Sequence, residues 1–366
     1  MRYVLAPFPE RTIGIDVGDQ VCDLCSLDYT GEGVRFAQVK TTQEAIRAHF
    51  AQDTPARVVL EVGTHSPWMA RLLKELGHEV LVANPSRMKE GRKKRGRKKS
   101  DRTDAERLAR LGRSDPELLC PIEHRSEEDQ AALARLRARD ALVGSRTALI
   151  NTVRGQVKAL GARLSRCSGP AFSKHVYDEL PPLLRPALVP LLETIQVLTV
   201  QIRRFDKEIE DALEGNDVAQ RLLAIGGVGP LTVYCFLHVI GNPKRFKRSR
   251  TVGDYVGLTP RLEESGGRGT GPELSISKAG DEMLRCLLVQ CAHYILGPFG
   301  ADCDLRRFGM RLMRGGQSKR AKNTAVVAVA RKLAVLMHHL WVSGQDYEPV
   351  HDATRVARET QATRAA

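Results

Sequence analysis

Short alternating and continuous apolar segments fill the N-terminal part of the chain and predict a sheet with interspersed helices. The expected elements are a β-hairpin over residues 12–28, a strand over 34–40, a helix over 42–52, a strand over 58–62, a helix over 67–76 and a strand over 79–83. Three strands followed by alternating helices and strands are typical of an α/β domain.

From residue 103 onward the apolar spacing becomes mostly helical. Thr103 and Glu106 form a capping box, which predicts the start of a helix over 103–113. A long amphipathic helix is expected over 127–164 and a mostly helical segment over 218–343. Between them, a second long helix is expected after Pro181 and Pro182 to about residue 213. Pro186 and Pro190 should delay the start of its regular part. The two long helices fit an antiparallel coiled arm and a helical linker core equally well.

These patterns divide the 366 residues into four parts. We expect an α/β domain over 1–124, a helical arm over 125–215, a mostly helical domain over 216–344 and a polar, disordered tail over 345–366.

Composition narrows the class of protein. The net charge of +14 at pH 7 favours a polyanionic partner. No apolar run approaches the roughly 20 residues that span a bilayer, and residues 1–11 lack the layout of a signal peptide, so we expect a cytoplasmic protein without a membrane segment. Cys22 and Cys25 lie at an odd offset in a predicted strand, which points them to opposite faces and favours core residues over a metal or redox pair.

Four carboxylates indicate metal-dependent chemistry. Asp16 lies in an apolar strand, Glu61 ends a later strand, and Asp101 and Asp104 share a helix start. Acids at the ends of buried strands are costly unless something pairs with them, and Mg²⁺ favours carboxylates together with phosphate oxygens. Such a set can hold two divalent ions about 4 Å apart and clamp a phosphodiester. Helix capping and a turn role are the simpler alternatives for single members, but the four together favour a metal site.

A dense basic segment directly precedes the last two acids. Residues 87–102 contain ten Lys or Arg and two acidic residues without apolar periodicity, which predicts a loop. The positive charge of this segment attracts phosphates. Because the segment lacks aromatic residues, it is expected to contact the nucleic-acid backbone rather than stack on bases. The candidate contacts are Arg92, Lys93, Lys94, Arg95, Arg97, Lys98 and Lys99. A solvated loop or a localisation signal is the alternative.

A second predicted phosphate contact lies in residues 222–233, which resemble a helix-hairpin-helix. Gly227 and Gly229 allow a tight turn, and backbone N–H groups at the start of the second helix can grip phosphates. Glycine turns also join helices without any ligand. A basic cluster that follows soon after adds Lys244, Arg245, Lys247 and Arg248.

Two serines are candidate nucleophiles. Ser265 opens a glycine-rich loop with Arg268 close behind, and a nearby cation favours an alkoxide that attacks phosphorus. Ser277 lies near the start of an apolar helix, with Lys278 and Arg285 as neighbours. A solvated loop serine at 265 and an N-cap at 277 are the alternatives.

Together these residues resemble the DEDD-type transposases of insertion sequences that use a bridge RNA as guide. The likeness extends over roughly residues 12–342, and the order of its motifs makes it specific. The matching segments are 13–17, 60–68, 82–85, 99–109, 225–229, 255–260, 265–266 and 276–280.

The resemblance implies a ribonuclease-H-like N-terminal domain similar to Holliday-junction resolvases, a coiled-coil arm and a helical C-terminal transposase domain. It implies that the four acids bind Mg²⁺ or Mn²⁺ and that a serine forms a covalent phosphoserine link to DNA. Ser265 matches the family position best and Ser277 ranks second.

The partners that the resemblance implies are donor and target double-stranded DNA and a structured guide RNA, with a homodimer or tetramer as the active form. The expected location is the bacterial cytoplasm, in association with the nucleoid. The basic run over 92–99 is heavier than the family needs.

Three competing interpretations remain. An actin-like or sugar-kinase ATPase opens on a similar strand, but it needs a second glycine-rich phosphate loop that the chain lacks at the required place. A junction-resolving endonuclease would use the acids and water without a serine. A nucleic-acid-binding protein without catalysis would leave the four acids unexplained.

Overall fold

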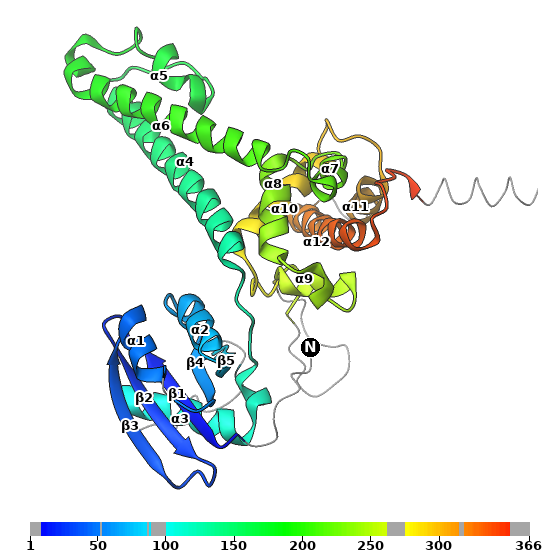
Figure 1. Cartoon of the computed structure of the whole chain (residues 1–366). Coiled ribbons are helices and arrows are strands. Elements are labelled where there is room, and N and C mark those ends of the chain that lie inside the picture. The colour runs from blue at the N-terminus through cyan, green and yellow to red at the C-terminus, as the bar shows by residue number, and fades with distance from the viewer. Residues whose placement is uncertain are drawn as a thin grey trace, which may run out of the picture. The chain divides into compact units, whose positions relative to one another are not determined.

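The structure is a computed structural model that describes residues 9–51, 53–85, 88, 100–261, 275–314 and 318–351. Its contacts divide the chain into two compact units, residues 1–125 and 126–366. Each unit is described by itself, with the element labels of Figure 1.

The first unit contains one mixed sheet with helices on its two faces (Figure 1). Its elements are β1 (Arg11–Val17), β2 (Val21–Asp28), β3 (Val34–Lys40), α1 (Gln43–Phe50), β4 (Arg57–Glu61), α2 (Ser66–Glu75), β5 (Glu79–Ala83) and α3 (Asp101–Ser114). The strand order is β3-β2-β1-β4-β5; β2 is antiparallel to β1 and β3, and β4 is parallel to β1 and β5. This arrangement is consistent with a ribonuclease-H-like fold.

Strand alternation distributes the core over both faces of the sheet. Ile13 and Ile15 pack with α1 and α2 residues, whereas Val59 packs with Leu108 of α3. Cys22 belongs to the first group, and Cys25 packs on the other face with Ala105 and Ala109 of α3. The two cysteines therefore point to opposite faces of the sheet and pack in its core, as predicted.

All five predicted strands are present within a residue or two of the expected bounds. Helix α3 begins two residues earlier than predicted, at Asp101 instead of Thr103. Ser100 is the N-cap, and its carbonyl accepts from the N–H groups of Thr103 and Asp104. The Arg102 guanidinium also lies 4.4 Å from the centre of the Phe36 ring on β3, which holds the start of the helix on the sheet.

The second unit is helical. Its longer elements are α4 (Glu127–Ala159), α6 (Arg185–Asp211), α8 (Pro230–Ile240), α10 (Glu282–Leu296), α11 (Asp304–Arg314) and α12 (Lys319–Ser343). The shorter helices are α5 (Phe172–His175), α7 (Asp217–Leu223) and α9 (Val252–Tyr255), with 3-10 turns at Pro116–Leu119 in the first unit and at Gly169–Ala171, Pro182–Leu184, Pro243–Arg245 and Ser249–Thr251 in the second.

Helices α4 and α6 pack against each other in opposite directions. Arg139 pairs with Asp206, and Arg146 donates to the Thr199 hydroxyl, so residues later in α4 meet residues earlier in α6. Val153 of α4 shares an apolar cluster with Leu192 of α6 at the far end of the pair. These contacts describe an antiparallel helical pair.

Two expectations for this pair are wrong in detail. Helix α4 ends at Ala159 instead of residue 164, because Gly161 adopts a φ of 81° that a regular helix cannot contain. Helix α6 is regular from Arg185, since Pro186 lies in the first turn, where its missing N–H costs nothing. Pro190 is accommodated inside the same helix.

The core of the second unit forms around α8, α10 and α12. Phe236 of α8, Leu288 of α10 and Leu333 of α12 are buried in one apolar cluster. By length and composition alone α6 and α12 are apolar enough to cross a membrane, contrary to the expectation that no such run exists. Half of the apolar window of α12 is buried in this core, which accounts for its composition without a bilayer.

The expectation of disorder from residue 345 is wrong for the first residues of the tail. Tyr347 packs against the core of the second unit, and burial raises the pKa of its hydroxyl group. The Asp304 N–H donates to the Pro349 carbonyl, and the His351 N–H donates to the Asp304 carboxylate. A partly buried aromatic ring and two hydrogen bonds thus anchor residues 347–351; residues 352–366 lie outside the described residues.

Candidate catalytic site

Asp16 and Glu61 lie at the carboxyl ends of two neighbouring parallel strands. Ile15 of β1 pairs with Leu60 of β4, so the two acids are the next residues along each strand. Thr12 of β1 lies against Gly112 of α3, so its side chain is on the face of the sheet that α3 covers. Because side chains alternate along a strand, Asp16 is on the α3 side of the sheet.

The same alternation applies to β4. Arg57 donates from Nη1 to the Gly112 carbonyl of α3, and Val59 packs with Leu108 of α3. Arg57, Val59 and Glu61 are alternate residues of β4, so the Glu61 side chain is also on the α3 side of the sheet.

Helix α3 packs on β1 at backbone distance. A Cβ atom at Gly14 would overlap the Ala105 carbonyl oxygen and would lie 2.5 Å from the Ala109 nitrogen. A Cβ atom at Gly112 would overlap the Val59 side chain. Glycine and alanine therefore form the contact between the helix and the sheet, and larger side chains at these positions would force the helix away.

The direction of α3 brings its first turn to the edge where β1 and β4 end. Its C-terminal part, at Gly112, lies by Thr12, and its middle, at Ala105, lies by Gly14. Two residues of strand advance about 6.6 Å and four residues of helix about 6 Å, so Asp16 corresponds to the start of α3. Asp101 and Asp104 occupy that start, three residues apart on the helix.

A fifth carboxylate, which the sequence analysis missed, lies beside Asp16. Asp23 of β2 is the antiparallel partner of Asp16, so both side chains are on the same face of the sheet. Asp23 is 9% exposed, and Gln38 donates to its Oδ1 at 2.9 Å. The register of the short hairpin is the signal that would have found it, because the Gly18–Asp19 turn sets residue 16 opposite residue 23.

The side chains themselves do not form a closed cluster. Within the described part of the chain, no three His, Cys, Asp or Glu side chains approach closely enough to hold a metal ion. Carboxylates that share an edge repel one another, which favours separated rotamers. The donor set consists of carboxylate oxygens, which suits Mg²⁺ or Mn²⁺ better than a soft metal, so the residues at this edge fit such an ion.

The loop after β4 adds a positioned histidine at the same edge. His65 Nε2 lies 3.3 Å from Asp19 Oδ1, and Trp68 Nε1 donates to His65 Nδ1 at 3.1 Å. Since Nδ1 accepts, the neutral ring carries its proton on Nε2. Asp19 follows β1 and His65 follows Glu61 of β4, which is the topological signal that links them.

The loop that contains Ser265 and Arg268 lies outside the described residues, but both of its ends are described. The Arg261 N–H donates to the Ser275 carbonyl at 3.2 Å, and Arg261 Nη2 donates to the Ser275 hydroxyl at 3.0 Å. Hydrogen bonds between Arg261 and Ser275 thus join the two ends of the segment that contains Ser265.

Ser277 lies in a tight backbone interlock next to these joined ends. Its N–H donates to the Thr259 carbonyl, and the Lys278 N–H donates to the Gly257 carbonyl. A Cβ atom at Gly257 would lie 2.7 Å from the Ala279 nitrogen, which explains the glycine. The N-cap of α10 is Asp281, so the alternative that Ser277 caps this helix is wrong. Lys278 is exposed with a φ of 54°, a conformation that costs a non-glycine residue free energy.

The predicted phosphate contact of Arg285 is wrong. The residue is 9% exposed, and its Nη1 donates to the Val256 and Gly280 carbonyls. Arg285 therefore holds the interlocked segments together from inside the core, where a nucleic acid cannot reach it.

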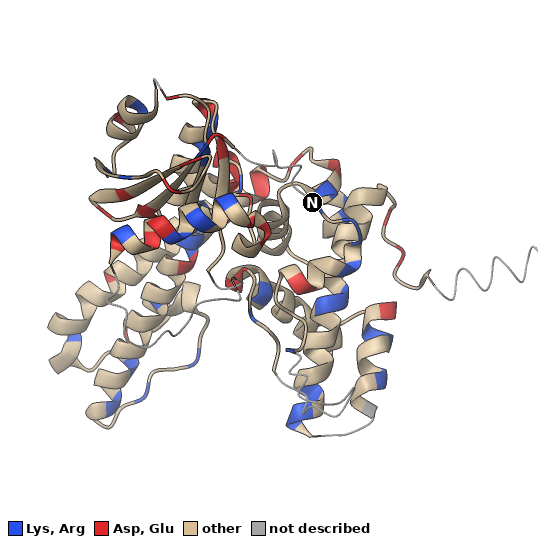
Figure 2. Cartoon of the chain, turned by 90° about the horizontal axis from the view of Figure 1, so that it is seen from below, with Lys and Arg blue, Asp and Glu red and all other residues tan. Residues whose placement is uncertain are grey.

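The cluster after α8 divides into one packed and three exposed cations. The Arg245 guanidinium stacks on the Phe246 and Tyr255 rings at 4.8 and 4.4 Å from their centres. Lys244, Lys247 and Arg248 are exposed and remain predicted phosphate contacts. Figure 2 shows Lys and Arg on helices of both units, while the run from Arg92 to Lys99 lies outside the described residues.

The glycine turn between α7 and α8 has two kinds of glycine. Gly227 has a φ of 90°, and a Cβ there would lie 2.7 Å from the Tyr294 ring, so packing and backbone conformation both require glycine. A Cβ at Gly226 or Gly229 would meet open space. Gly229 is the N-cap of α8 without a side-chain cap, so its small size leaves room for an approaching ligand.

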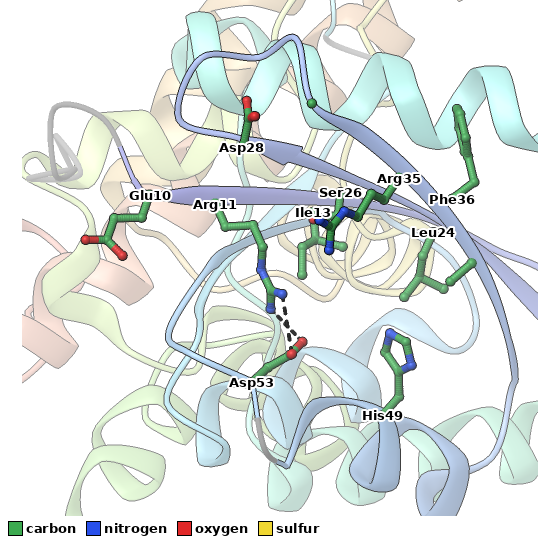
Figure 3. Close-up of a pocket in the computed structure, with 12 residues that line it drawn as sticks. Glu10, Arg11, Ile13, Leu24, Ser26, Asp28, Arg35, Phe36, His49 and Asp53 are labelled. Atoms are coloured by element: carbon green, nitrogen blue, oxygen red, sulfur yellow. Dashed lines mark hydrogen bonds and ion pairs between the residues drawn. The ribbon is translucent and has the colours of Figure 1, made fainter.

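The first unit also has a pocket of about 520 Å³, drawn in Figure 3. It lies by the N-terminal end of β1, where Arg11 pairs with Asp53 and the lining includes Ile13 and Leu24 of the face that packs on α1 and α2. None of the predicted catalytic residues lines it.

Comparisons with known proteins identify the family of the chain. One transposase family model matches residues 13–161, and the model of the IS116/IS110/IS902 transposase family matches residues 219–298. A "Probable family 20 transposase" of Pseudomonas aeruginosa is 31% identical over 344 residues, which cover 92% of this chain and 98% of that protein. The "Transposase for insertion sequence element IS1328" of Yersinia enterocolitica is 31% identical over 88% of this chain and 94% of its own length. A "Pilin gene-inverting protein" of Moraxella lacunata is 30% identical over 125 residues, 34% of this chain and 37% of its own.

A DNA transposase is the class of enzyme that these matches define. The chain belongs to the IS116/IS110/IS902 family of insertion-sequence transposases, as its resemblance predicted. Membership among the DEDD-type transposases indicates a divalent metal cofactor and DNA substrates.

The close approach of α3 to β1 is open to a stability test. Gly14→Ala should lower the free energy of unfolding by about 2–3 kcal/mol, because the added methyl group overlaps the α3 backbone. Gly63→Ala is the matched control, since a Cβ at Gly63 meets open space. Urea unfolding of both variants measures the difference; equal stability would contradict the described contact.

Proposed function

We propose that this transposase cuts and rejoins donor and target DNA with a metal site of four acids and a serine nucleophile. The observation that carries the proposal is the register of α3 on the sheet, which supports Asp101 and Asp104 as neighbours of Asp16 and Glu61. The fifth carboxylate, Asp23, adds negative charge at the same edge.

The four acids would hold Mg²⁺ or Mn²⁺ through carboxylate oxygens. When bound, such ions supply charge neutralisation at the oxygens of the reacting phosphodiester. The chain's own part is to fix the position of the acids, two on rigid strands and two on a helix whose docking leaves little freedom. His65 accepts from Trp68 at Nδ1 and faces the Asp19 carboxylate with Nε2, so these two contacts fix its ring at this edge.

Ser265 would act as the nucleophile. Its Oγ forms a bond to phosphorus while the bond to one deoxyribose oxygen breaks, and that oxygen leaves as a hydroxyl group with a proton. The serine proton passes to a base or to solvent. A free hydroxyl of a second strand then attacks the phosphoserine, which restores Ser265 and joins the strands. One phosphoester replaces another, so the sequence needs no external energy source.

The acids belong to the first unit and the serine loop to the second. A homodimer or tetramer would allow acids and serine of different subunits to meet on one phosphodiester. The pairing of both DNAs with a structured guide RNA would select the sites, and the basic residues would contact backbone phosphates. The relative named for pilin-gene inversion supports recombination of duplex DNA as the wider activity.

The metal site is tested by Asp104→Asn, which keeps the shape of the side chain and removes its charge. Strand cleavage should fall by at least about 100-fold, while RNA binding stays unchanged. Glu106→Gln is the matched control on the same helix, where Glu106 pairs with Arg110. Cleavage is measured on labelled donor DNA with Mg²⁺ and the flanking RNA of the element. Full cleavage by Asp104→Asn would exclude this metal site.

The nucleophile is tested by the covalent product. Wild-type protein should yield a protease-sensitive, slowly migrating DNA band on a denaturing gel, and Ser265→Ala should yield none. Ser277→Ala should still give the band, because its backbone and not its hydroxyl is tied into the Gly257 interlock. An adduct that persists in Ser265→Ala and disappears in Ser277→Ala would reverse the assignment. Cleaved DNA without any adduct would favour hydrolysis by the acids alone.

The glycine turn is tested by adding one methyl group. Gly229→Ala should leave the fold intact and weaken duplex binding about tenfold, because the methyl group occupies the space that a phosphate would use. Gly226→Ala adds the same group to the same turn, also in open space, and should bind like wild type. Fluorescence anisotropy of a labelled 30-base-pair duplex measures both. Wild-type affinity in Gly229→Ala would remove the turn from the DNA contacts.

A further inference from the structure

The turn between α10 and α11 presents one exposed aromatic side chain on a held backbone. Phe299 is 82% exposed. Arg306 Nη1 donates to the Ile295 and Gly297 carbonyls, both at 2.6 Å. A Cβ atom at Gly300 would overlap the Ile295 carbonyl oxygen, so the backbone on the far side of Phe299 is also closely packed. The turn is therefore held on both sides of an exposed phenylalanine.

This turn directly follows the part of α10 that packs on the glycine turn. A Cβ at Gly227 would lie 2.7 Å from Tyr294 and 3.2 Å from Ile295. Tyr294 is itself 51% exposed, and Phe299 follows it by five residues. Tyr294 thus lies beside the turn that would grip phosphates, and Phe299 follows shortly after the end of α10.

The charge of the adjoining helix indicates the nature of the partner. Helix α11 contains four arginines and one aspartate. Arg306 is engaged by the backbone carbonyls and Arg307 by Asp302, but Arg311 is exposed. Exposed Lys319 and Arg320 follow at the start of α12, which packs on α11. This sequence of charges complements a phosphate backbone that runs past Phe299.

We propose that Phe299 inserts against a base step of the duplex DNA that the glycine turn grips. Single exposed apolar residues are common on protein surfaces, but this one lies on a held backbone turn between α10, which packs on the glycine turn, and the basic helix α11. Apolar side chains that unstack a base step allow the duplex to bend and contact more of the protein. A preordered turn lowers the entropy that binding costs. The proposal rests on the proposed DNA contact of the glycine turn.

The test uses the full chain, a labelled 30-base-pair duplex and a series of salt concentrations. Phe299→Ala should weaken binding about tenfold, as expected for the loss of one aromatic–base contact. The slope of log affinity against log salt concentration should not change, because no phosphate contact is lost. Phe299→Trp should keep the affinity, and its added tryptophan fluorescence, relative to wild type, should be quenched by the DNA. Leu183→Ala is the matched control, since Leu183 is 88% exposed in the same unit.

Each other outcome has a defined meaning. Wild-type affinity in Phe299→Ala, with weakened binding in Gly229→Ala, would overturn the insertion and leave the turn contact intact. Wild-type protein that does not bind the duplex would overturn both. Weakened binding of the structured RNA alone, or a changed oligomer on size-exclusion chromatography with unchanged DNA affinity, would assign Phe299 to another partner and overturn the proposal.

Discussion

The backbone-level packing of α3 on β1 is the contact on which the candidate site depends. Gly14 has no side chain, and Ala105, Ala109 and Gly112 supply the facing surface of the helix. Any larger residue at Gly14 would move α3 outward and carry its first turn away from the ends of β1 and β4. Arg57 secures the other half of the helix through its bond to the Gly112 carbonyl. Two strand acids and two helix acids therefore share an edge only because the packing between them is so close.

The carboxylates at that edge repel one another. Asp16 and Asp23 are cross-strand partners, and like charges in this relation are unfavourable in a sheet. Violations of this kind are expected at functional sites, where a ligand of opposite charge relieves them. The stability of the first unit must come from its two apolar layers, which bury Ile15 on one side of the sheet and Val59 on the other.

In the second unit, positive charge has two distinct uses. Arg285 and Arg306 donate to backbone carbonyls and hold together segments that have no regular structure. Lys244 and Arg311 are exposed and available to a polyanion. A net charge of +14 therefore overstates the number of cations that can contact nucleic acid.

Local patterns predicted most of the elements. Alternation was sufficient for the five strands, because each is a half-buried or buried segment with clear ends. Helix ends were less predictable. The capping box at Thr103 was a plausible start, but the helix begins two residues earlier, after Ser100, where Arg102 stacks on Phe36 of a distant strand. The polar tail likewise gave no sign that Tyr347 would find a site in the core.

The sequence by itself determined the class of enzyme and the order of the elements, and it supplied the candidate acids and serines, because these depend on residue types and on spacing along the chain. Only the tertiary structure decided which side chains share a site. It brought Asp23 beside Asp16 through the hairpin register, and it removed Arg285 from the surface by burying it against two carbonyls. Burial and register depend on residues far apart in the chain, and spacing along one segment carries no information about them.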